Sequence, residues 1–307
     1  MDKKIKKTVI ITGYKCNNMC QFCIDEHRRD IRDKNTREIM EEMILARERG
    51  TTYLELIGGE TSIRSDVLDL LKHAKGLGFQ TIAMATNGRM LSYNKFAEQI
   101  VEAGLTDLIF SIHGHNEELH DKLTRVKGSY IQLMNGFENV KELLGLRRIG
   151  TNTTIVKENY PYVDKIGTML HEMGVRNSEF IFVDPTCGGA HDNFDAYVPR
   201  ISDAAPYIRK CLDIGKKGGA YHWTIRYVPL CYFQEYLDQI SELGEVETFE
   251  TEHLAPDFQN FDVEGSRKKV GRSRPEKCKP CKLYDKCEGV WNDYLKNYGD
   301  TELKPIL

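Results

Sequence analysis

The chain has 307 residues, of which 40% are hydrophobic and 29% charged, and its formal net charge at pH 7 is −3. This composition is typical of a globular protein, and the length accommodates one large domain with an appendage. The slightly acidic balance provides no overall basic field for nucleic acid. No apolar run reaches the roughly eighteen residues that a membrane span requires.

The first seven residues are basic, but no signal-peptide core or cleavage site follows them. We therefore expect a cytoplasmic protein. Thiols stay reduced in that compartment, so the nine cysteines are expected to act as metal ligands rather than in disulfides.

Strand and helix patterns alternate between residues 9 and 183. The predicted strands are 9–12, 52–57, 79–86, 107–112, 149–156 and 179–183, and the predicted helices are 36–50, 66–76, 94–103, 129–144 and 160–173. This order predicts a parallel sheet built from right-handed βαβ units. Such sheets place their sites at the C-terminal ends of the strands. Periodicity alone does not separate a barrel from an open, doubly wound sheet.

The pattern changes after residue 220. Residues 221–228 are predicted as a strand and 232–243 as a helix, whereas 250–274 are polar and weakly patterned and are predicted as a surface loop. Arg267 to Lys282 is rich in Lys and Arg. Cysteines gather from Lys277 onward, and three aromatic residues follow them, Trp291, Tyr294 and Tyr298.

Three cysteines, Cys16, Cys20 and Cys23, lie within eight residues just after the first predicted strand. Thiolates this close can converge on one centre, and sulfur ligands favour zinc or an iron–sulfur cluster. Three thiolates leave one iron of a four-iron cluster open. The alternative is a structural zinc site, which lacks a fourth ligand nearby.

The spacing Cys-x3-Cys-x2-Cys resembles the signature of the radical S-adenosylmethionine (SAM) enzymes. The resemblance implies an α/β fold with a partial (β/α)6 TIM barrel over about residues 5–200, and a [4Fe-4S] cluster whose open iron chelates SAM. It implies reductive cleavage of SAM to a 5′-deoxyadenosyl radical, with an electron donor such as flavodoxin or ferredoxin. It also places Phe22 near the adenine.

Gly58-Gly59-Glu60 follows the second predicted strand and resembles the family's Gly-Gly-Glu motif, in which the backbone and the glutamate hold the amine of SAM. Two glycines let the backbone approach a ligand closely, and a carboxylate accepts hydrogen bonds from an ammonium group. A glycine turn with a solvated glutamate is the alternative.

Three more residues are assigned to SAM by the resemblance. Ser111 and Arg125 match a serine and an arginine that contact its ribose and carboxylate, and a guanidinium suits a carboxylate. Asn152, in the fifth strand, is expected within reach of the ribose. His113 is interpreted instead as a packed or hydrogen-bonded histidine, and Asn87 fits a strand-end turn equally well.

A second cysteine group contains Cys278, Cys281 and Cys287, with Cys231 upstream. Four thiolates suffice for zinc or a closed cluster, and ligand count does not separate these. The aromatic run that follows resembles the tail of radical SAM proteins with a twitch appendage, a shortened SPASM domain. This implies a second, auxiliary [4Fe-4S] cluster, in a domain of residues 216–307 that follows a radical SAM core of residues 1–215. Whether Cys231 or a substrate completes its ligands stays open.

Two cysteines remain. Cys211 is interpreted as a small buried hydrophobe within a helix. Cys187 follows the sixth predicted strand and precedes Gly188-Gly189, where a substrate has room to approach. We consider it as a hydrogen donor that quenches a substrate radical, as radical epimerases require, against a loop cysteine without chemistry.

The favoured function is a radical SAM enzyme that abstracts a substrate hydrogen atom in the modification of a ribosomally made peptide. A radical epimerase or dehydrogenase of a small molecule, such as an aminoglycoside or a cofactor precursor, is the alternative. A zinc or iron–sulfur module without catalysis is a third interpretation; it requires a basic face for a partner or nucleic acid, for which Arg267 to Lys282 is the candidate.

Overall fold

The structure is a computed structural model that describes residues 4–307. Its centre is a sheet with the strand order β7-β6-β5-β4-β3-β2-β1-β8-β9. Neighbouring strands from β7 to β8 are parallel, and β9 is antiparallel to β8. The strands are β1 (Ile5–Ile11), β2 (Tyr53–Ile57), β3 (Thr81–Thr86), β4 (Asp107–Ser111), β5 (Ile149–Ile155), β6 (Asn177–Phe182), β7 (His222–Arg226), β8 (Phe249–Leu254) and β9 (Gln259–Asn260).

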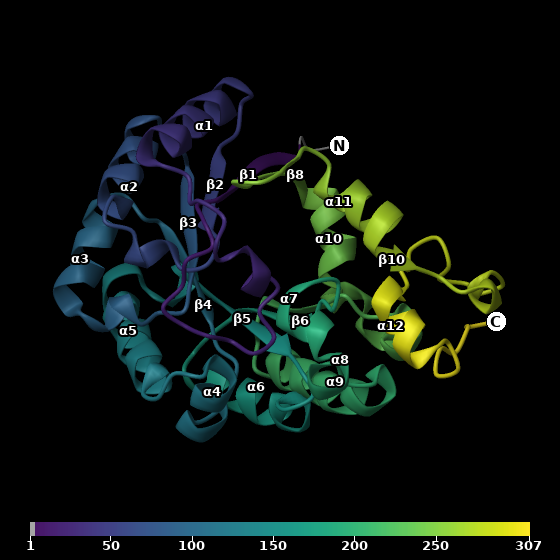
Figure 1. Cartoon of the computed structure of the whole chain (residues 1–307). Helices are drawn as coiled ribbons and strands as arrows, with labels where there is room; N and C mark the ends of the chain where they lie inside the picture. The colour runs from purple at the N-terminus through teal and green to yellow at the C-terminus, as the bar shows by residue number, and fades with distance from the viewer. Residues whose placement is uncertain (1–3) are drawn as a thin grey trace.

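Most helices follow individual strands and lie outside the curved sheet (Figure 1). They are α1 (Thr36–Glu48), α2 (Val67–Gly76), α3 (Asn94–Glu102), α4 (Glu117–Thr124), α5 (Ser129–Leu144), α6 (Val163–Glu172), α7 (Gly188–Asp192), α8 (Phe194–Tyr197), α9 (Ile201–Lys217), α10 (Ser241–Thr248), α11 (Val263–Ser266) and α12 (Asn292–Tyr298). Two short strands, β10 (Arg272–Ser273) and β11 (Val290–Trp291), form a separate antiparallel pair.

Helix α1 shows why these segments are helical. Its N-terminus is a capping box, in which Asn35 Oδ1 accepts from the Glu38 amide at 3.0 Å and the Glu38 carboxylate accepts from the Asn35 amide at 2.7 Å. Ile39, Met43 and Ala46 recur at helical spacing and are fully buried. Capping and one apolar face together fix this helix on the sheet.

The predicted α/β class and parallel sheet are confirmed, and each of the first six predicted strands overlaps a strand of the structure. The loop predicted for residues 250–274 is wrong, because β8, β9, α11 and β10 all fall within this range. Phe249–Leu254 forms β8, which pairs in parallel with β1 from Ile5↔Phe249 to Ile10↔Leu254. The charged residues Glu250 and Glu252 make the sequence of this strand polar, so its pattern does not indicate a strand. In the structure the Glu252 carboxylate accepts hydrogen bonds from the Thr8 hydroxyl and the Arg49 guanidinium.

The helix predicted for residues 232–243 is also wrong in part, since a 3₁₀ turn at Gln234–Gln239 precedes α10. Helix α10 contacts both β7 and β8 and so lies between these two strands. The segment after residue 216 therefore adds β7 to one edge of the β1–β6 sheet and β8 with β9 to the other. The division into domains at residues 215 and 216 stays a prediction.

The C-terminal segment is anchored to α9. Two amides at the start of this helix, those of Ile201 and Ser202, donate to the Tyr294 hydroxyl at 2.8 Å and to Glu302 Oε2 at 2.9 Å. Helix N-termini leave such donors without intrahelical partners, so these contacts cap α9. Tyr298 completes the anchor by donating to the Val198 carbonyl at 2.8 Å.

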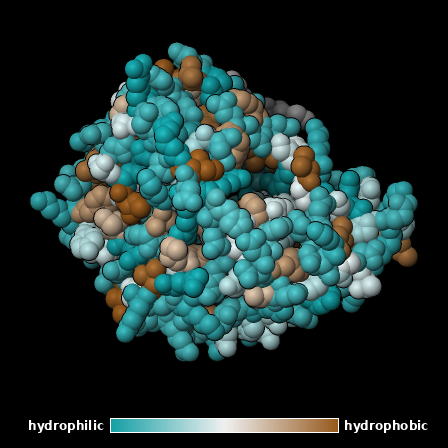
Figure 2. All heavy atoms as spheres, in the orientation of Figure 1, coloured by the Kyte–Doolittle hydropathy of each residue, from teal (hydrophilic) through white to brown (hydrophobic). Residues whose placement is uncertain are grey.

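The face shown in Figure 2 is mainly hydrophilic, with scattered hydrophobic residues. Within residues 4–307, no helix combines the length and the apolar character needed to cross a membrane. Cys211 is fully buried in the core beneath α6, where its Sγ would lie 2.6 Å from a Cβ added at Gly167. Its interpretation as a packing residue is confirmed.

Candidate active site

Cys16, Cys20 and Cys23 line one cavity of about 130 Å³ at the C-terminal ends of β1–β4. The other lining residues are Tyr14, Asn18, Arg29, Gly58, Gly59, Glu60, Ala85, Thr86, Asn87, Ser111 and His113. The three thiols therefore meet the Gly-Gly-Glu motif and Ser111 in one place, because parallel strands end at the same edge of the sheet.

Gly58 and Gly59 hold the cysteine loop, residues 12–25, from one side. The Gly59 amide donates to the Gly13 carbonyl at 2.9 Å, and the Glu60 amide donates to the Lys15 carbonyl at 2.9 Å. A Cβ at Gly58 would lie 2.2 Å from the Gly13 oxygen, and one at Gly59 would lie 2.2 Å from the Lys15 oxygen. The close approach that these glycines permit is therefore to the cysteine loop.

Gly188 and Gly189 hold the same loop from the other side. The Gly189 amide donates to the Cys23 carbonyl at 3.0 Å. A Cβ at Gly188 would lie 2.1 Å from that carbonyl oxygen, and one at Gly189 would lie 2.1 Å from the Gln21 oxygen. The room expected here for a substrate is thus filled by the cysteine loop.

Glu60 is buried and hydrogen-bonded within the protein. Its Oε1 accepts from the Ser62 amide at 3.1 Å, the Ser62 hydroxyl at 2.5 Å and the Thr86 hydroxyl at 2.7 Å, whereas Oε2 accepts from the Asn87 amide at 2.6 Å. Burial raises the pKa of this carboxyl, and these donors oppose the rise. Oε2 has one protein donor and keeps a lone pair for another.

Burial raises the pKa of all three thiols, that of Cys16 to about 11. Each sulfur is therefore neutral near pH 7 until a metal displaces its proton. The charges of Cys16 and Cys23 also raise the pKa of Cys20, so the three sulfurs are close enough to interact electrostatically. Residues 4–307 contain no three His, Cys, Asp or Glu side chains arranged around a single ion, so the fit to a cluster rests on the shared cavity.

Phe22 and His113 pack against each other beside this cavity. Their rings are edge to face at 4.9 Å, and both residues are buried. Burial, reinforced by His120, lowers the pKa of His113 to about 3, and its Nδ1 accepts from the Thr154 amide at 3.3 Å. His113 is thus a neutral, hydrogen-bonded histidine, as the sequence predicts.

Besides Phe22, which packs beside the cavity, three residues predicted for this site do not line it. Arg125 is exposed at the end of α4, where its φ of 55° is left-handed. Asn152 lines a separate cavity that also contacts Lys7 and Arg226. Cys187 is half-buried, and its thiol donates to the Ile24 carbonyl at 3.4 Å.

Asn87 and Arg89 hold the cysteine loop, and neither was assigned to the site from the sequence. Asn87 Nδ2 donates to Asn17 Oδ1 at 2.7 Å and lies 3.8 Å from Cys16 Sγ. Arg89 bonds the Asn17 carbonyl and donates to Asn18 Oδ1 at 3.1 Å. Their position just after β3 was the available signal, since polar side chains at strand ends face the site.

The second cysteine group also shares one cavity. Cys231, Cys278, Cys281 and Cys287 line it, and the remaining lining is largely apolar: Pro229, Leu230, Arg274, Pro275, Leu283, Tyr284, Gly289, Leu303 and Pro305. Burial raises the pKa of Cys231 and Cys278.

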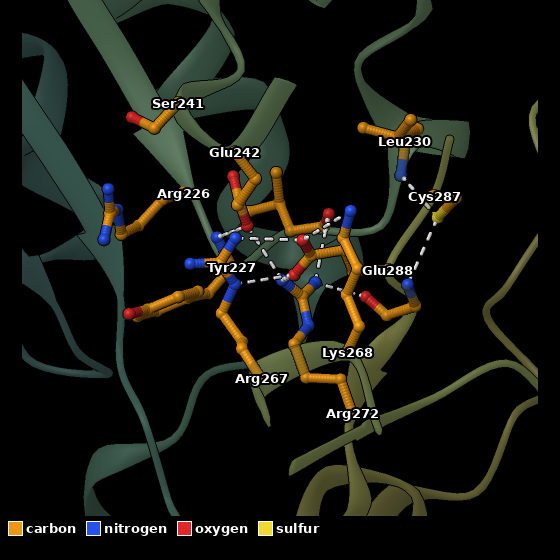
Figure 3. Close-up of polar contacts among 12 residues, drawn as sticks. Arg226, Tyr227, Leu230, Ser241, Glu242, Arg267, Lys268, Arg272, Cys287 and Glu288 are labelled. Atoms are coloured by element: carbon orange, nitrogen blue, oxygen red, sulfur yellow. Dashed lines mark hydrogen bonds and ion pairs between the residues drawn. The ribbon is translucent and has the colours of Figure 1, made fainter. Parts of the chain in front are cut away.

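Backbone amides point at two of these four sulfurs. Cys287 Sγ accepts from Leu230 at 3.5 Å and from Gly289 at 3.4 Å (Figure 3), and Cys281 Sγ accepts from Ile306 at 3.4 Å. The backbone at Lys304 opposes the rise that burial causes in the pKa of Cys231. Such bonds stabilise thiolates and tune iron–sulfur clusters, so the donor set fits a cluster.

A buried charge network holds the second cavity against the sheet (Figure 3). Arg272 pairs with Glu242 of α10 at 2.8 Å and with Glu288 at 3.3 Å, and Arg267 pairs with Glu288 at 2.8 Å. Glu242 also accepts from the Tyr227 amide at 2.7 Å, just beyond β7. Breaking such a buried pair typically costs about 3–5 kcal/mol, so the network fixes Glu288 and the adjoining Cys287.

A family model described as the radical SAM superfamily matches residues 10–170, just over half of the chain. This chain belongs to the radical SAM superfamily. Its relatives in this superfamily are enzymes, and membership implies SAM and a SAM-binding [4Fe-4S] cluster as cofactors. The matched range contains Cys16, Cys20 and Cys23.

Two curated relatives of this radical SAM protein differ in name and in extent. AdoMet-dependent heme synthase of Oleidesulfovibrio alaskensis is 30% identical over 173 residues, which are 56% of this chain and 44% of that protein. GTP 3′,8-cyclase of Alkaliphilus metalliredigens is 26% identical over 221 residues, which are 66% of this chain and 68% of that protein. The match thus spans less than half of the heme synthase.

Solved structures share the fold over a longer range. Streptococcus suis SuiB, bound to the precursor peptide SuiA, has a TM-score of 0.68 at 14% identity, covering 96% of this chain and 74% of SuiB. The enzyme anSMEcpe, with bound AdoMet and a peptide, has a TM-score of 0.59 at 14% identity, covering 78% of this chain and 68% of its own.

Proposed function

We propose that this radical SAM enzyme abstracts a hydrogen atom from a peptide substrate and carries a second, auxiliary iron–sulfur cluster. The observation that carries the first part is the meeting of three thiols with Gly58-Gly59-Glu60 and Ser111 in one cavity at the strand ends. When bound, the first cluster and SAM supply a 5′-deoxyadenosyl radical.

The residues divide the work of holding this cofactor pair. Cys16, Cys20 and Cys23 ligate three irons and leave the fourth to SAM. Oε2 of Glu60 accepts from the amine of SAM with its remaining lone pair, and Ser111 binds the ribose. Phe22 supports the adenine end through its contact with His113.

Arg125 keeps its proposed contact to the carboxylate of SAM only if the end of α4 shifts on binding, and Asn152, inside strand β5, reaches the ribose only if SAM extends beyond the first cavity. Arg125 is exposed at the end of α4, and Asn152 lines the neighbouring cavity. Substituting either residue with alanine while measuring the affinity for SAM tests each assignment separately.

The auxiliary cluster is proposed for the second cavity, with Cys231, Cys278, Cys281 and Cys287 as its ligands. Four cysteines in an apolar cavity, two of which accept hydrogen bonds from backbone amides, support a closed cluster. This is the twitch-like appendage expected from the sequence, in a chain whose relatives act through iron–sulfur chemistry.

A peptide substrate is favoured by the extent of the structural likeness. The fold of SuiB, solved in complex with a precursor peptide, resembles 96% of this chain, and this share includes the second cysteine group. The rival is a small molecule, favoured by the sequence relatives named GTP 3′,8-cyclase. Incubation with a short peptide encoded beside this gene, and in parallel with GTP, separates the two by the product formed.

The first test of the function is anaerobic. The reconstituted protein is mixed with SAM and dithionite, and 5′-deoxyadenosine is measured by mass spectrometry. Release of deoxyadenosine is expected, whereas a zinc or iron–sulfur binding module without catalysis releases none.

Cys187 is proposed as a hydrogen donor to the substrate radical only in the epimerase version of the function. Its thiol now donates to a carbonyl of the cysteine loop, so it must rotate to reach a substrate. In that version, Cys187→Ala keeps deoxyadenosine formation and loses the normal product. An unchanged product yield returns Cys187 to a loop-packing role.

A further inference from the structure

The segment around the second cavity is strongly basic in an acidic chain. Residues 267–286 contain nine Lys and Arg against two Asp and Glu, and the rest of the chain contains 34 against 44. Neither proposed cluster explains this excess, because thiolate ligands need no surrounding cations on the outer face. A positively charged segment on a chain that is otherwise negatively charged favours binding of a negatively charged partner.

Four of these nine cations line a groove of about 250 Å³ that also contacts Cys287, namely Lys268, Arg272, Arg274 and Lys286. Lys268, Arg274 and Lys286 lie along it with the single exposed acid Asp285. The other carboxylate of the groove, Glu288, is already held by buried Arg267 and Arg272. The groove therefore presents a positive potential to solvent.

The groove and the second cavity share a wall. Cys287, Arg274 and Tyr284 line both of them, so the sulfur of Cys287 separates the proposed cluster from the surface by one side chain. Electron exchange between proteins needs a short path, and the shared residue Cys287 provides one. The geometry fits a redox partner on the outside.

Two of the cations are free for a partner. Arg274 and Lys286 are exposed, and neither has a carboxylate within 4.0 Å anywhere in residues 4–307. The Arg274 guanidinium lies 4.0 Å from the centre of the Tyr284 ring and bonds the Tyr284 carbonyl. It thereby covers the aromatic face of the groove on which a nucleic-acid base would stack, which argues against single-stranded nucleic acid.

We propose that this groove is the docking site of an acidic one-electron carrier protein of the flavodoxin class, which reduces the auxiliary cluster. The inference rests on the proposed auxiliary cluster. In the exchange, the reduced carrier transfers one electron to the cluster, so the carrier is oxidised and the cluster is reduced by one electron. No bond forms or breaks in the step.

The test compares the reconstituted holoenzyme with a variant that carries Lys268→Gln and Lys286→Gln, which line the groove but not the second cavity. A matched control carries Lys72→Gln and Lys95→Gln, which removes the same charge elsewhere on the surface. Binding of oxidised flavodoxin is measured by titration calorimetry at low and at moderate salt. Reduction of the enzyme by reduced flavodoxin is followed through the flavin absorbance and the electron paramagnetic resonance of the clusters.

We expect the groove variant to bind flavodoxin about tenfold more weakly at low salt, with a flatter salt dependence, and the control to match the wild type. Iron content and dithionite-driven SAM cleavage should be equal in all three proteins. Equal binding and equal reduction rates in the groove variant overturn the proposal, as does loss of binding to a 20-nucleotide single-stranded DNA without loss of flavodoxin binding.

The failures of the two proposals are distinguishable. A wild-type protein that binds only four irons and cleaves SAM with dithionite refutes the auxiliary cluster, and with it the electron transfer. A wild-type protein that binds about eight irons and is not bound or reduced by flavodoxin refutes the docking site alone.

Discussion

The two cysteine sites differ in what surrounds their sulfurs. The N-terminal cavity has three thiols beside polar groups, including Glu60, Asn87 and Ser111. The C-terminal cavity has four thiols, a largely apolar lining and backbone amides aimed at two of the sulfurs. The first cavity thus offers polar side chains to a ligand beside its sulfurs. In the second cavity the hydrogen bonds to the sulfurs come from the backbone of the chain itself.

The sites also differ in how their loops are fixed. The N-terminal loop is held through its backbone by the glycine pairs Gly58-Gly59 and Gly188-Gly189, which lie on different strand ends. The C-terminal site is held by charge, through Arg272, Glu242 and Glu288. A backbone clamp leaves side-chain space free for a ligand, whereas a buried charge network fills that space.

The largest expected effect separates the sites by activity. Cys16→Ala removes one of three ligands, so SAM cleavage should fall below detection while the circular dichroism spectrum stays native. Deoxyadenosine is measured after anaerobic reconstitution, with Cys211→Ala as the control thiol from the core. A Cys16→Ala protein that still cleaves SAM would refute the assignment of the first site.

The second prediction separates the sites by metal content. Wild-type protein should bind about eight irons per chain, and Cys281→Ala should lower this to about four. Some SAM cleavage should survive, because the first cavity is untouched. Iron and zinc are both measured by plasma mass spectrometry. One zinc with four irons in the wild type would show that the second site is a zinc site.

The third prediction tests the backbone clamp. Gly189→Ala places a Cβ 2.1 Å from the Gln21 carbonyl oxygen, so the loop must move. We expect a loss of about 1–3 kcal/mol in the free energy of unfolding, with reduced iron at the first site only. Gly76→Ala is the control, since its added Cβ meets nothing within 4 Å. If both variants bind iron alike, the clamp has no role in cluster assembly.

The smallest predicted effect concerns acid. The pKa of His113 is lowered to about 3 in the folded protein, below its usual value near 6.5, so its contribution to stability is complete above pH 6.5 and is lost as pH falls toward 3. His113→Gln should remove about 1.4 kcal/mol per pH unit from the slope of unfolding free energy between pH 6 and 4. Urea unfolding at four pH values measures this slope. A slope that the substitution leaves unchanged would show that His113 titrates near its ordinary pKa.

The strands of the main sheet were readable from the sequence where they are buried on both faces. The apolar run at Val9–Ile11 is buried throughout, and in Leu108–Phe110 the two outer residues are buried, so both runs favour a covered strand. Strand β8 was not readable, because Glu250 and Glu252 make its sequence polar and its partners lie more than 240 residues away. Local pattern carries no information about such a distant partner.

The site was readable where its residues follow strand ends directly. The three cysteines, Gly58-Gly59-Glu60 and Ser111 meet in the first cavity, as their positions predict. The assignments of Arg125 and Asn152 rested on their order along the chain. Arg125 lies on the solvent side of a helix end and Asn152 lies inside a strand, and chain order does not determine either direction.

The pairing of β1 with β8 has a consequence for biosynthesis. The second strand emerges early and covers one edge of β1, but the other edge waits for residues 249–254. Until they leave the ribosome, β1 has an open edge that invites pairing with other chains. Contacts between segments so distant also slow folding, since closing a long loop costs entropy before any contact offsets it. The cysteine loop follows β1 directly, so its metal is expected to enter only after residue 254 has left the ribosome, and nascent chains that stall before this residue are expected to aggregate.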